Sequence, residues 1–262
     1  INILSTLLTS DTGTINIFNL PLTSHSNKIK AQLGIVPQEI ALYEDISAYH
    51  NVAFFASLYG VKKKDLPKQV MNALTFVGLS DKKNDDPRTF SGGMKRRLNI
   101  ACAIAHNPKL LILDEPTVGI DPQSRNYILS SLKELKEKGT TIIYTTHYME
   151  IADRIVIMDR GTKIAEGTLK ELLAKYKDTL IYTIYADNFP VDLAISLSTI
   201  NGVEEIKTNA DNFKITVSKN YDALDKIIML FVHKKCHINK METEEGNLEM
   251  VFLGLTGKKL RD

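Results

Sequence analysis

The segment from Phe90 to Asp121 restricts the possible folds more than any other part of this chain. It reads FSGGMKRRLNIACAIAHNPKLLILDEPTVGID, so that a Ser-Gly-Gly turn, an amphipathic stretch and a continuous apolar run follow in that order. Apolar residues at 98, 101, 102 and 105 form a helical stripe that ends before Pro108. The apolar run that follows Lys109 is typical of a strand buried on both faces of a parallel sheet. The segment therefore predicts a turn, a helix and a buried strand of an α/β domain.

Two acidic residues, Asp114 and Glu115, end the predicted strand. An open α/β sheet presents its binding crevice at the carboxyl ends of its strands, which suits a phosphate or metal site. Hydrophobic strands that end in Asp are common, and the acid pair alone would favour a solvated strand end. The residues PTVGID that follow the pair reverse that interpretation in favour of a functional site.

The turn formed by Ser91, Gly92 and Gly93 is suited to hold an anion. Glycines let a ligand approach the backbone closely, and the N–H groups at a helix start point toward negative charge. Ser91 adds a hydroxyl donor. A Ser-Gly-Gly turn by itself is usually an ordinary helix cap. Its position about twenty residues before the acid-ended strand indicates the anion site instead.

Strands and helices alternate over the first part of the chain. Short β-rich runs at 14–18 and 33–36 predict two strands, separated by a turn-prone segment at 19–27. Residues 40–89 predict a helical insertion, with one helix between Ser47 and Gly60 and a second at 66–77.

The alternation continues after the acid pair. Asp121 and Pro122 predict the start of a helix that closes at Gly139, and the run 140–146 predicts another buried strand, which ends at His147. The basic residues Lys95, Arg96 and Arg97 are interpreted as a solvated helix face without a catalytic role. The other histidines have no metal-ligand spacing.

The pattern changes near residue 177. Strands at 154–159 and 162–166, with Thr168 as the cap of a short helix, complete an α/β domain over residues 1–177. The segments from 180 to 243 then have a β-α-β-β-α-β order, which predicts a small ferredoxin-like α+β domain at 178–262.

Composition excludes few classes of function. The chain has 33 basic and 31 acidic residues, and this net charge of +2 gives no electrostatic reason to expect nucleic-acid binding. The chain has two cysteines, and they lie far apart in sequence. We therefore expect neither a disulfide framework nor a cysteine metal site. No apolar run reaches the ~20 residues that span a bilayer, so a membrane role would need a partner with spanning helices.

Taken together, these motifs resemble the ATPase subunit of ABC transporters, and the tail LEMVFLGLTGKKLRD resembles the closing helix of its drug-resistance branch. The resemblance implies a P-loop NTPase-like, mostly parallel sheet with a helical insertion, and ATP and Mg²⁺ as cofactors. The family form has Gln where this chain has Met94, a replacement familiar in one branch of bacterial and archaeal exporters.

The resemblance also implies a role for each candidate residue. Asp114 would hold Mg²⁺ through water and Glu115 would polarise the attacking water. Gln38, directly after a strand and a proline, would offer oxygen to Mg²⁺ and an amide to that water. His147 would sense the γ-phosphate. The candidates for binding nucleotide are Ser91, Gly92, Gly93 and Asp121, with the Ser-Gly-Gly turn facing the nucleotide of a second subunit.

One motif of the family is missing, because no Gly-x-x-x-x-Gly-Lys-Ser/Thr phosphate loop occurs in the sequence. Apolar residues at 1, 4 and 8 have helical spacing and Gly13 can end a helix, so INILSTLL resembles the helix that follows that loop. We expect that the chain is truncated before or within this helix. The alternative is a degenerate subunit that never had the loop, yet it would have no physical need for the acid pair, Gln38 and His147.

A first prediction concerns turnover by the 262-residue chain alone. We expect little or no steady-state ATPase activity, because the lysine and backbone donors that grip the β- and γ-phosphates are missing from its sequence. Magnesium-dependent phosphate release from the purified chain measures this, and robust hydrolysis would contradict it.

The resemblance implies a cytoplasmic protein bound to the inner face of the cell membrane through an integral-membrane permease subunit. It also implies a second ATPase subunit, in a head-to-tail homodimer or heterodimer, and export as the direction of transport. Two alternatives stay open: a regulatory partner without catalysis, and a soluble mechanical ATPase outside transport. The second alternative usually has tandem ATPase units or coiled-coil insertions, whereas this chain has one unit and no heptad run.

Overall fold

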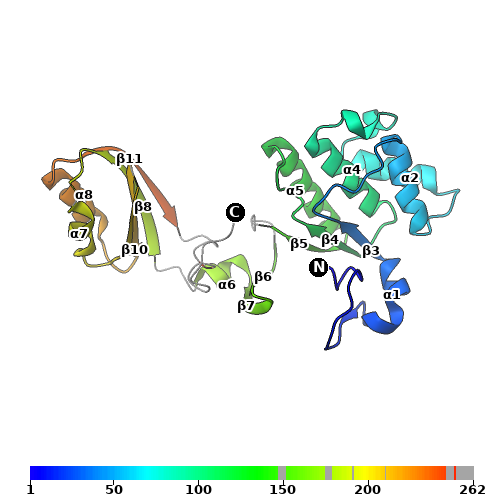
Figure 1. Ribbon diagram of the computed structural model, residues 1–262, viewed down its shortest axis with the longest axis horizontal. Coiled ribbons are helices and arrows are strands. Elements are labelled where there is room, and N and C mark those ends of the chain that lie inside the picture. Colours follow the sequence, from blue (N-terminus) through cyan, green and yellow to red (C-terminus); the bar gives the residue numbers. More distant parts are fainter. Residues whose placement is uncertain (147–151, 175–178, 191, 210, 246–250, 252–262) are drawn as a thin grey trace. The chain divides into compact units, whose positions relative to one another are not determined.

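The computed structural model describes residues 1–146, 152–174, 179–190, 192–209, 211–245 and 251 (Figure 1). The chain divides into two compact units, Ile1–Ile151 and Ala152–Asp262. The predicted domain boundary between 177 and 178 lies outside the described residues and stays a prediction, as does the structure of the C-terminal tail beyond residue 251. No helix in the described ranges combines the length and apolar character needed to cross a bilayer.

A parallel three-stranded sheet forms the centre of the first unit. Its strands are β3 (Leu33–Val36), β4 (Leu110–Asp114) and β5 (Thr141–Thr145), in the order β3-β4-β5. Leu111, Ile112 and Leu113 of β4 are completely buried, because both neighbours and both faces of this strand are covered. The predicted parallel sheet is confirmed, and the acid-ended strand β4 lies in its middle.

Strand β5 differs from the prediction in one respect. Residues 141–145 do form a strand, but exposed and half-buried side chains alternate along it, and Ile143 is 38% exposed. Within the described residues β5 pairs only with β4, so it lies at the edge of its sheet. Its apolar sequence was interpreted as burial on both faces, and that interpretation is wrong for this edge position.

The helices predicted between residues 47 and 139 are confirmed, and they pack beside the sheet (Figure 1). Ser47, Ser91 and Asp121 each accept a hydrogen bond from the backbone N–H three residues later, which satisfies a free donor in the first helical turn. The helical elements after β3 are α2 (Ala48–Leu58), α3 (Leu66–Phe76), the 3₁₀ helices η1 (Ser80–Lys82) and η2 (Pro87–Thr89), α4 (Gly92–Ile104) and α5 (Pro122–Glu137).

The first 32 residues depart most from the predictions. Residues 1–8 form turns rather than a helix, with Thr6 at a φ of 63° and Leu7 and Leu8 exposed. So short a helix is marginal without a covered apolar face, which explains the failure. A tight turn at 18–19 joins β1 (Asn16–Ile17) to β2 (Leu20–Pro21), and the predicted turn-prone segment continues into helix α1 (Leu22–Lys30).

The second unit begins with a β-hairpin of β6 (Ile155–Asp159) and β7 (Thr162–Gly167), followed by α6 (Leu169–Ala174). Thr168 and Glu171 form a reciprocal cap, in which each backbone N–H donates to the other residue's side-chain oxygen at 2.8 and 3.1 Å. The predicted strands and the predicted cap at Thr168 are confirmed.

A four-stranded antiparallel sheet forms the rest of this unit, in the order β11-β8-β10-β9. Helices α7 and α8 cover one of its faces (Figure 1). The β-α-β-β-α-β order predicted from the sequence is confirmed as a ferredoxin-like arrangement. Its elements are β8 (Thr179–Asp187), α7 (Leu193–Ser198), β9 (Val203–Thr208), β10 (Asn212–Ser218), α8 (Leu224–His233) and β11 (His237–Glu245).

Candidate functional site

The carboxyl ends of β3, β4 and β5 lie at one edge of the parallel sheet. Val36 pairs with Leu113, and Asp114 pairs with Thr145, so the residues that follow these strands gather there. This register explains why Gln38, which is 77 positions before Glu115 in sequence, reaches its side chain.

Three of the predicted site residues meet at this edge. The side-chain amide of Gln38 donates a 3.0 Å hydrogen bond from Nε2 to Oε2 of Glu115. Glu115 follows Asp114 at the end of β4 and has a φ of 44°, in the left-handed region that is unfavourable for residues with a side chain. Such a backbone conformation is stored strain, which is typical of functional positions.

Thr145 orients the acid pair, a role that the sequence analysis missed. Its hydroxyl accepts a 2.9 Å hydrogen bond from the backbone N–H of Glu115 and donates a 2.5 Å hydrogen bond to Oδ1 of Asp114. A parallel pairing of 110–114 with 141–145 places a threonine hydroxyl beside the acids. The sequence shows both strands but not their register, so this contact could not be read from it.

The donor set at this edge fits a hard cation. Carboxylate, amide and hydroxyl oxygens are the ligands of Mg²⁺, which usually takes one or two carboxylates and completes its shell with water and phosphate oxygens. No cluster of three or more His, Cys, Asp or Glu residues suited to a metal occurs in the described part of the chain. The acid pair therefore suits Mg²⁺ bound together with a nucleotide rather than a metal held by protein alone.

The Ser-Gly-Gly turn begins α4, as predicted. The backbone N–H of Met94 donates to Oγ of Ser91 at 3.2 Å. A Cβ atom added to Gly92 would meet nothing within 4 Å, whereas one added to Gly93 would lie 2.2 Å from Oγ of Ser124 and 2.9 Å from Oδ2 of Asp121. The two glycines are therefore required for different reasons. A side chain at Gly92 would fill open space, whereas a side chain at Gly93 would collide with the start of α5.

Asp121 begins α5 beside Gly93. Its Oδ1 accepts a 2.8 Å hydrogen bond from the backbone N–H of Ser124. This bond and a hydrogen bond from the Ser124 side chain hold the pKa of Asp121 below its usual value. The structure brings Asp121 to the Ser-Gly-Gly turn, and its contact with nucleotide stays a prediction. His147 lies outside the described residues, so its predicted role is not addressed.

Two of the three basic residues in the first turns of α4 do not lie on a solvated face, contrary to the prediction. Arg96 is only 4% exposed, and Arg97 donates a 3.0 Å hydrogen bond from Nη1 to the backbone oxygen of Val77. The interpretation of residues 95–97 as a solvated face is wrong for these two arginines, because Arg96 donates to the backbone of residues 37 and 38 and Arg97 to that of residues 77 and 78. Lys95 differs from them, because its side chain forms a surface ion pair with Glu44 at 2.6 Å.

Comparison with known proteins identifies the family. A family model described as "ABC transporter" matches residues 1–118. The chain is 39% identical over 268 residues to the linearmycin resistance ATP-binding protein LnrL of Bacillus subtilis (strain 168), with 100% of this chain and 86% of the relative covered. It is 30% identical to the daunorubicin resistance ATP-binding protein DrrA3 of Streptomyces coeruleorubidus, with 100% and 84% covered.

Solved structures agree with this assignment. An ATP-binding subunit of an ABC transporter matches with a TM-score of 0.60 and 27% identity, over 67% of this chain and 75% of that chain. The cbiO1 protein of Clostridium perfringens, part of the cbiONQ transporter complex, has the same TM-score and 33% identity, over 67% and 73%. This chain therefore belongs to the ATP-binding subunits of ABC transporters, the ATPases that power transport.

Proposed function

We propose that, together with a phosphate loop, this chain binds and hydrolyses ATP, as one of two such subunits, to power export by a membrane permease. The observation that carries the site assignment is the 3.0 Å contact between Gln38 and Glu115 beside Asp114. Direction is inferred from the relatives, whose names describe drug resistance and, at 33% identity in Cupriavidus metallidurans, Nod factor export.

Each residue at the sheet edge has a proposed task. Asp114 would hold Mg²⁺, which when bound neutralises charge on the phosphates. Glu115 accepts a hydrogen bond from the attacking water and thereby raises its nucleophilicity. Gln38 orients that water with its amide and offers its carbonyl oxygen to the metal. Thr145 fixes the Asp114 carboxylate and the Glu115 backbone, since its hydroxyl donates to Asp114 and accepts from the backbone N–H of Glu115. His147 is proposed to contact the γ-phosphate.

The second part of the site serves a nucleotide held by the partner subunit. Ser91, Gly92 and Gly93 present a hydroxyl and backbone N–H groups at the start of α4, and this end of the helix carries partial positive charge. The open space above Gly92 leaves room for phosphate oxygens. Asp121, adjacent to Gly93, is proposed to join the same interface.

A surface near Gln38 is proposed as the contact with the permease. Tyr43 and Phe54 are in edge-to-face contact with ring centroids 5.0 Å apart, although both are well exposed. Further exposed apolar residues on the same segment and on α2 are Ile40, Ile46 and Leu58. A patch of this kind indicates a protein contact. It would place the chain at the cytoplasmic side of the membrane through the permease.

The dimeric part of the proposal is tested by Ser91→Ala in a mixed dimer with an ATPase subunit that has an intact phosphate loop. We expect the partner's ATP turnover to fall about 100-fold or more, because a donor aimed at its phosphates is lost. Ser47→Ala is the matched control, since it removes a serine cap from α2 at a similar cost of about 1 kcal/mol in stability. Equal turnover in the two mixed dimers would contradict the composite site.

A further inference from the structure

Arg96 is a buried cation without a counter-ion. It lies in α4 five residues after Ser91 and is 4% exposed. No carboxylate in the described part of the chain forms an ion pair with it, and its buried Nε has no hydrogen-bond partner there. Burial lowers the pKa of the guanidinium. Within the described residues its guanidinium donates hydrogen bonds to backbone carbonyl oxygens alone.

The two carbonyl groups that Arg96 contacts lie on either side of the Gln38 Cα atom. Nη1 of Arg96 donates to the backbone oxygen of Pro37 at 2.7 Å, and Nη2 donates to the backbone oxygen of Gln38. The first oxygen belongs to the peptide plane before the Gln38 Cα and the second to the plane after it. Because each peptide unit is rigid, holding both planes fixes the direction in which the Gln38 side chain leaves the backbone.

The Gln38 side chain in turn contacts the acid at the end of β4, through the 3.0 Å bond to Glu115. A continuous chain of contacts therefore runs from the Ser91 turn along α4 to Arg96, then through the Pro37 and Gln38 carbonyls, and finally to the Glu115 carboxylate. Within the first unit this chain connects the two halves of the candidate site.

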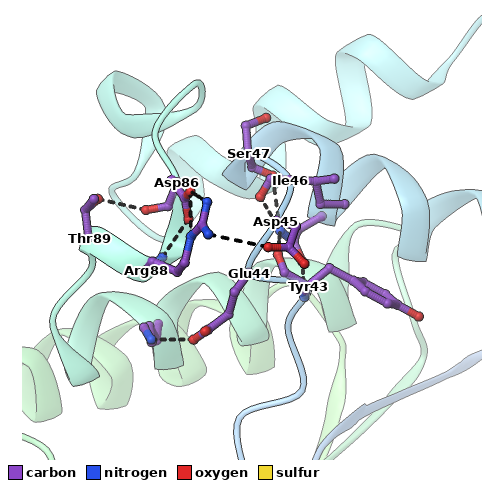
Figure 2. Close-up of polar contacts among 10 residues, drawn as sticks. Tyr43, Glu44, Asp45, Ile46, Ser47, Asp86, Arg88 and Thr89 are labelled. Carbon is purple, nitrogen blue, oxygen red and sulfur yellow. Dashed lines mark hydrogen bonds and ion pairs between the residues drawn. The ribbon is translucent and has the colours of Figure 1, made fainter.

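Other contacts hold the segment farther along the chain from Gln38. The buried side chain of Asn51 exchanges 2.8 Å hydrogen bonds with the backbone N–H and oxygen of Tyr43. Figure 2 shows Arg88 between Asp86 and Asp45, and the Arg88–Asp45 ion pair measures 3.5 Å with Asp45 93% exposed on its side chain. Asn99 of α4 donates to the backbone oxygen of Ala41 at 3.5 Å. Exposed ion pairs of this kind contribute about 0–1 kcal/mol. Among the described residues, the buried two-fold contact of Arg96 is the one made to the backbone on both sides of the Gln38 Cα atom.

We infer that Arg96 is a positioning residue: it sets the Gln38 side chain against Glu115 and transmits movement of the Ser91 helix to that acid. The inference rests on the proposed function for its consequence, namely that a nucleotide engaged by the Ser91 turn of one subunit changes the geometry at Gln38 of the same subunit. The geometric part of the inference, that Arg96 fixes the position of Gln38, does not depend on the proposed function.

The geometric content is tested by NMR relaxation on the 262-residue chain. We expect Arg96→Met to lower the order parameter of the Gln38 backbone amide from about 0.85 to below about 0.6, with α4 unchanged. Arg96→Lys, which keeps the charge but lacks the planar fork, is expected to lower it less and remains informative if the methionine variant does not fold. Lys95→Met on the same helix turn is the control, with no expected change at Gln38. An unchanged Gln38 amide in either folded variant of Arg96, or equal loosening throughout α4, would overturn the inference.

The functional consequence is tested by a double-mutant cycle in a subunit that carries a phosphate loop and is assembled with its permease. We expect Arg96→Met to lower kcat by roughly 10- to 100-fold and to change the KM for ATP by less than about threefold, because a misplaced side chain affects the reaction more than binding. In a Gln38→Ala background the same change should cost less than about threefold. Fully additive losses would overturn a role through Gln38.

The two experiments separate failure of the inference from failure of the proposed function. If Gln38→Ala leaves turnover unchanged while the order parameter still falls in Arg96→Met, the contact exists and the proposed role of Gln38 in hydrolysis is wrong. If Gln38→Ala lowers turnover but Arg96→Met changes neither Gln38 order nor kcat, Arg96 is not a positioning residue and the proposed function stands.

Discussion

Glu115→Gln is expected to lower ATP turnover of a permease-bound subunit that carries a phosphate loop by about 10²- to 10⁴-fold, the range associated with loss of a positioned general base. The glutamine side chain has the same length and still offers an oxygen to the Gln38 amide, which donates at 3.0 Å to Glu115. The variant lacks a carboxylate that can accept hydrogen bonding from water as an anion. Nucleotide affinity should therefore be preserved while hydrolysis is lost.

Single-turnover phosphate release and nucleotide binding, measured on the same preparation, distinguish these two effects. Glu134→Gln is a suitable control, because Glu134 lies on the exposed surface of α5 in an ion pair with Lys138 at 2.6 Å. Its turnover should stay within about twofold of the parent, since an exposed pair contributes little. Retention of more than about a tenth of the parent turnover by Glu115→Gln would reject Glu115 as the base.

The second large effect is expected at Gly93. In Gly93→Ala the new Cβ would lie 2.2 Å from Oγ and 2.6 Å from Cβ of Ser124, so α4 and the start of α5 must move apart. We expect a loss of roughly 1–3 kcal/mol in the free energy of unfolding, the usual cost of overpacking, together with loss of turnover.

Gly92→Ala provides the matched comparison, because the Cβ there meets nothing within 4 Å. Its free energy of unfolding should be unchanged or higher by roughly 0.4–1 kcal/mol, since alanine has less freedom than glycine in the unfolded chain. It should still impair the partner's turnover by filling the space proposed for phosphate. Urea denaturation of both variants gives the comparison, and equal stabilities would show that α5 does not restrict residue 93.

The sequence predicted the parts of the site that lie within one element. Ser91, Asp121 and Ser47 are local caps, and a helix start is specified by a side chain and the backbone three residues later. The acid-ended strand β4 was equally predictable, because a strand that is covered on both faces has a continuous apolar sequence.

Contacts between distant elements were not predicted. The packing of Arg96 under residues 37 and 38 depends on a separation of nearly sixty positions, and a run of three basic residues gives no sign of which side chain turns inward. The same limit applied to Thr145, whose partner depends on strand register, and to β5, whose exposure depends on which strands stand beside it. Hydrophobic periodicity predicts which face of an element is apolar, but not which other elements pack against that face.

The backbone at Glu115 has a consequence for how this sequence can vary. A φ of 44° is unstrained for glycine and only slightly unfavourable for asparagine, but it raises the free energy of the folded state for other residues. A search for thermostable variants that ignored hydrolysis should therefore recover glycine or asparagine at this position. Such variants would be more robust and inactive, which marks residue 115 as a place where stability and catalysis oppose one another.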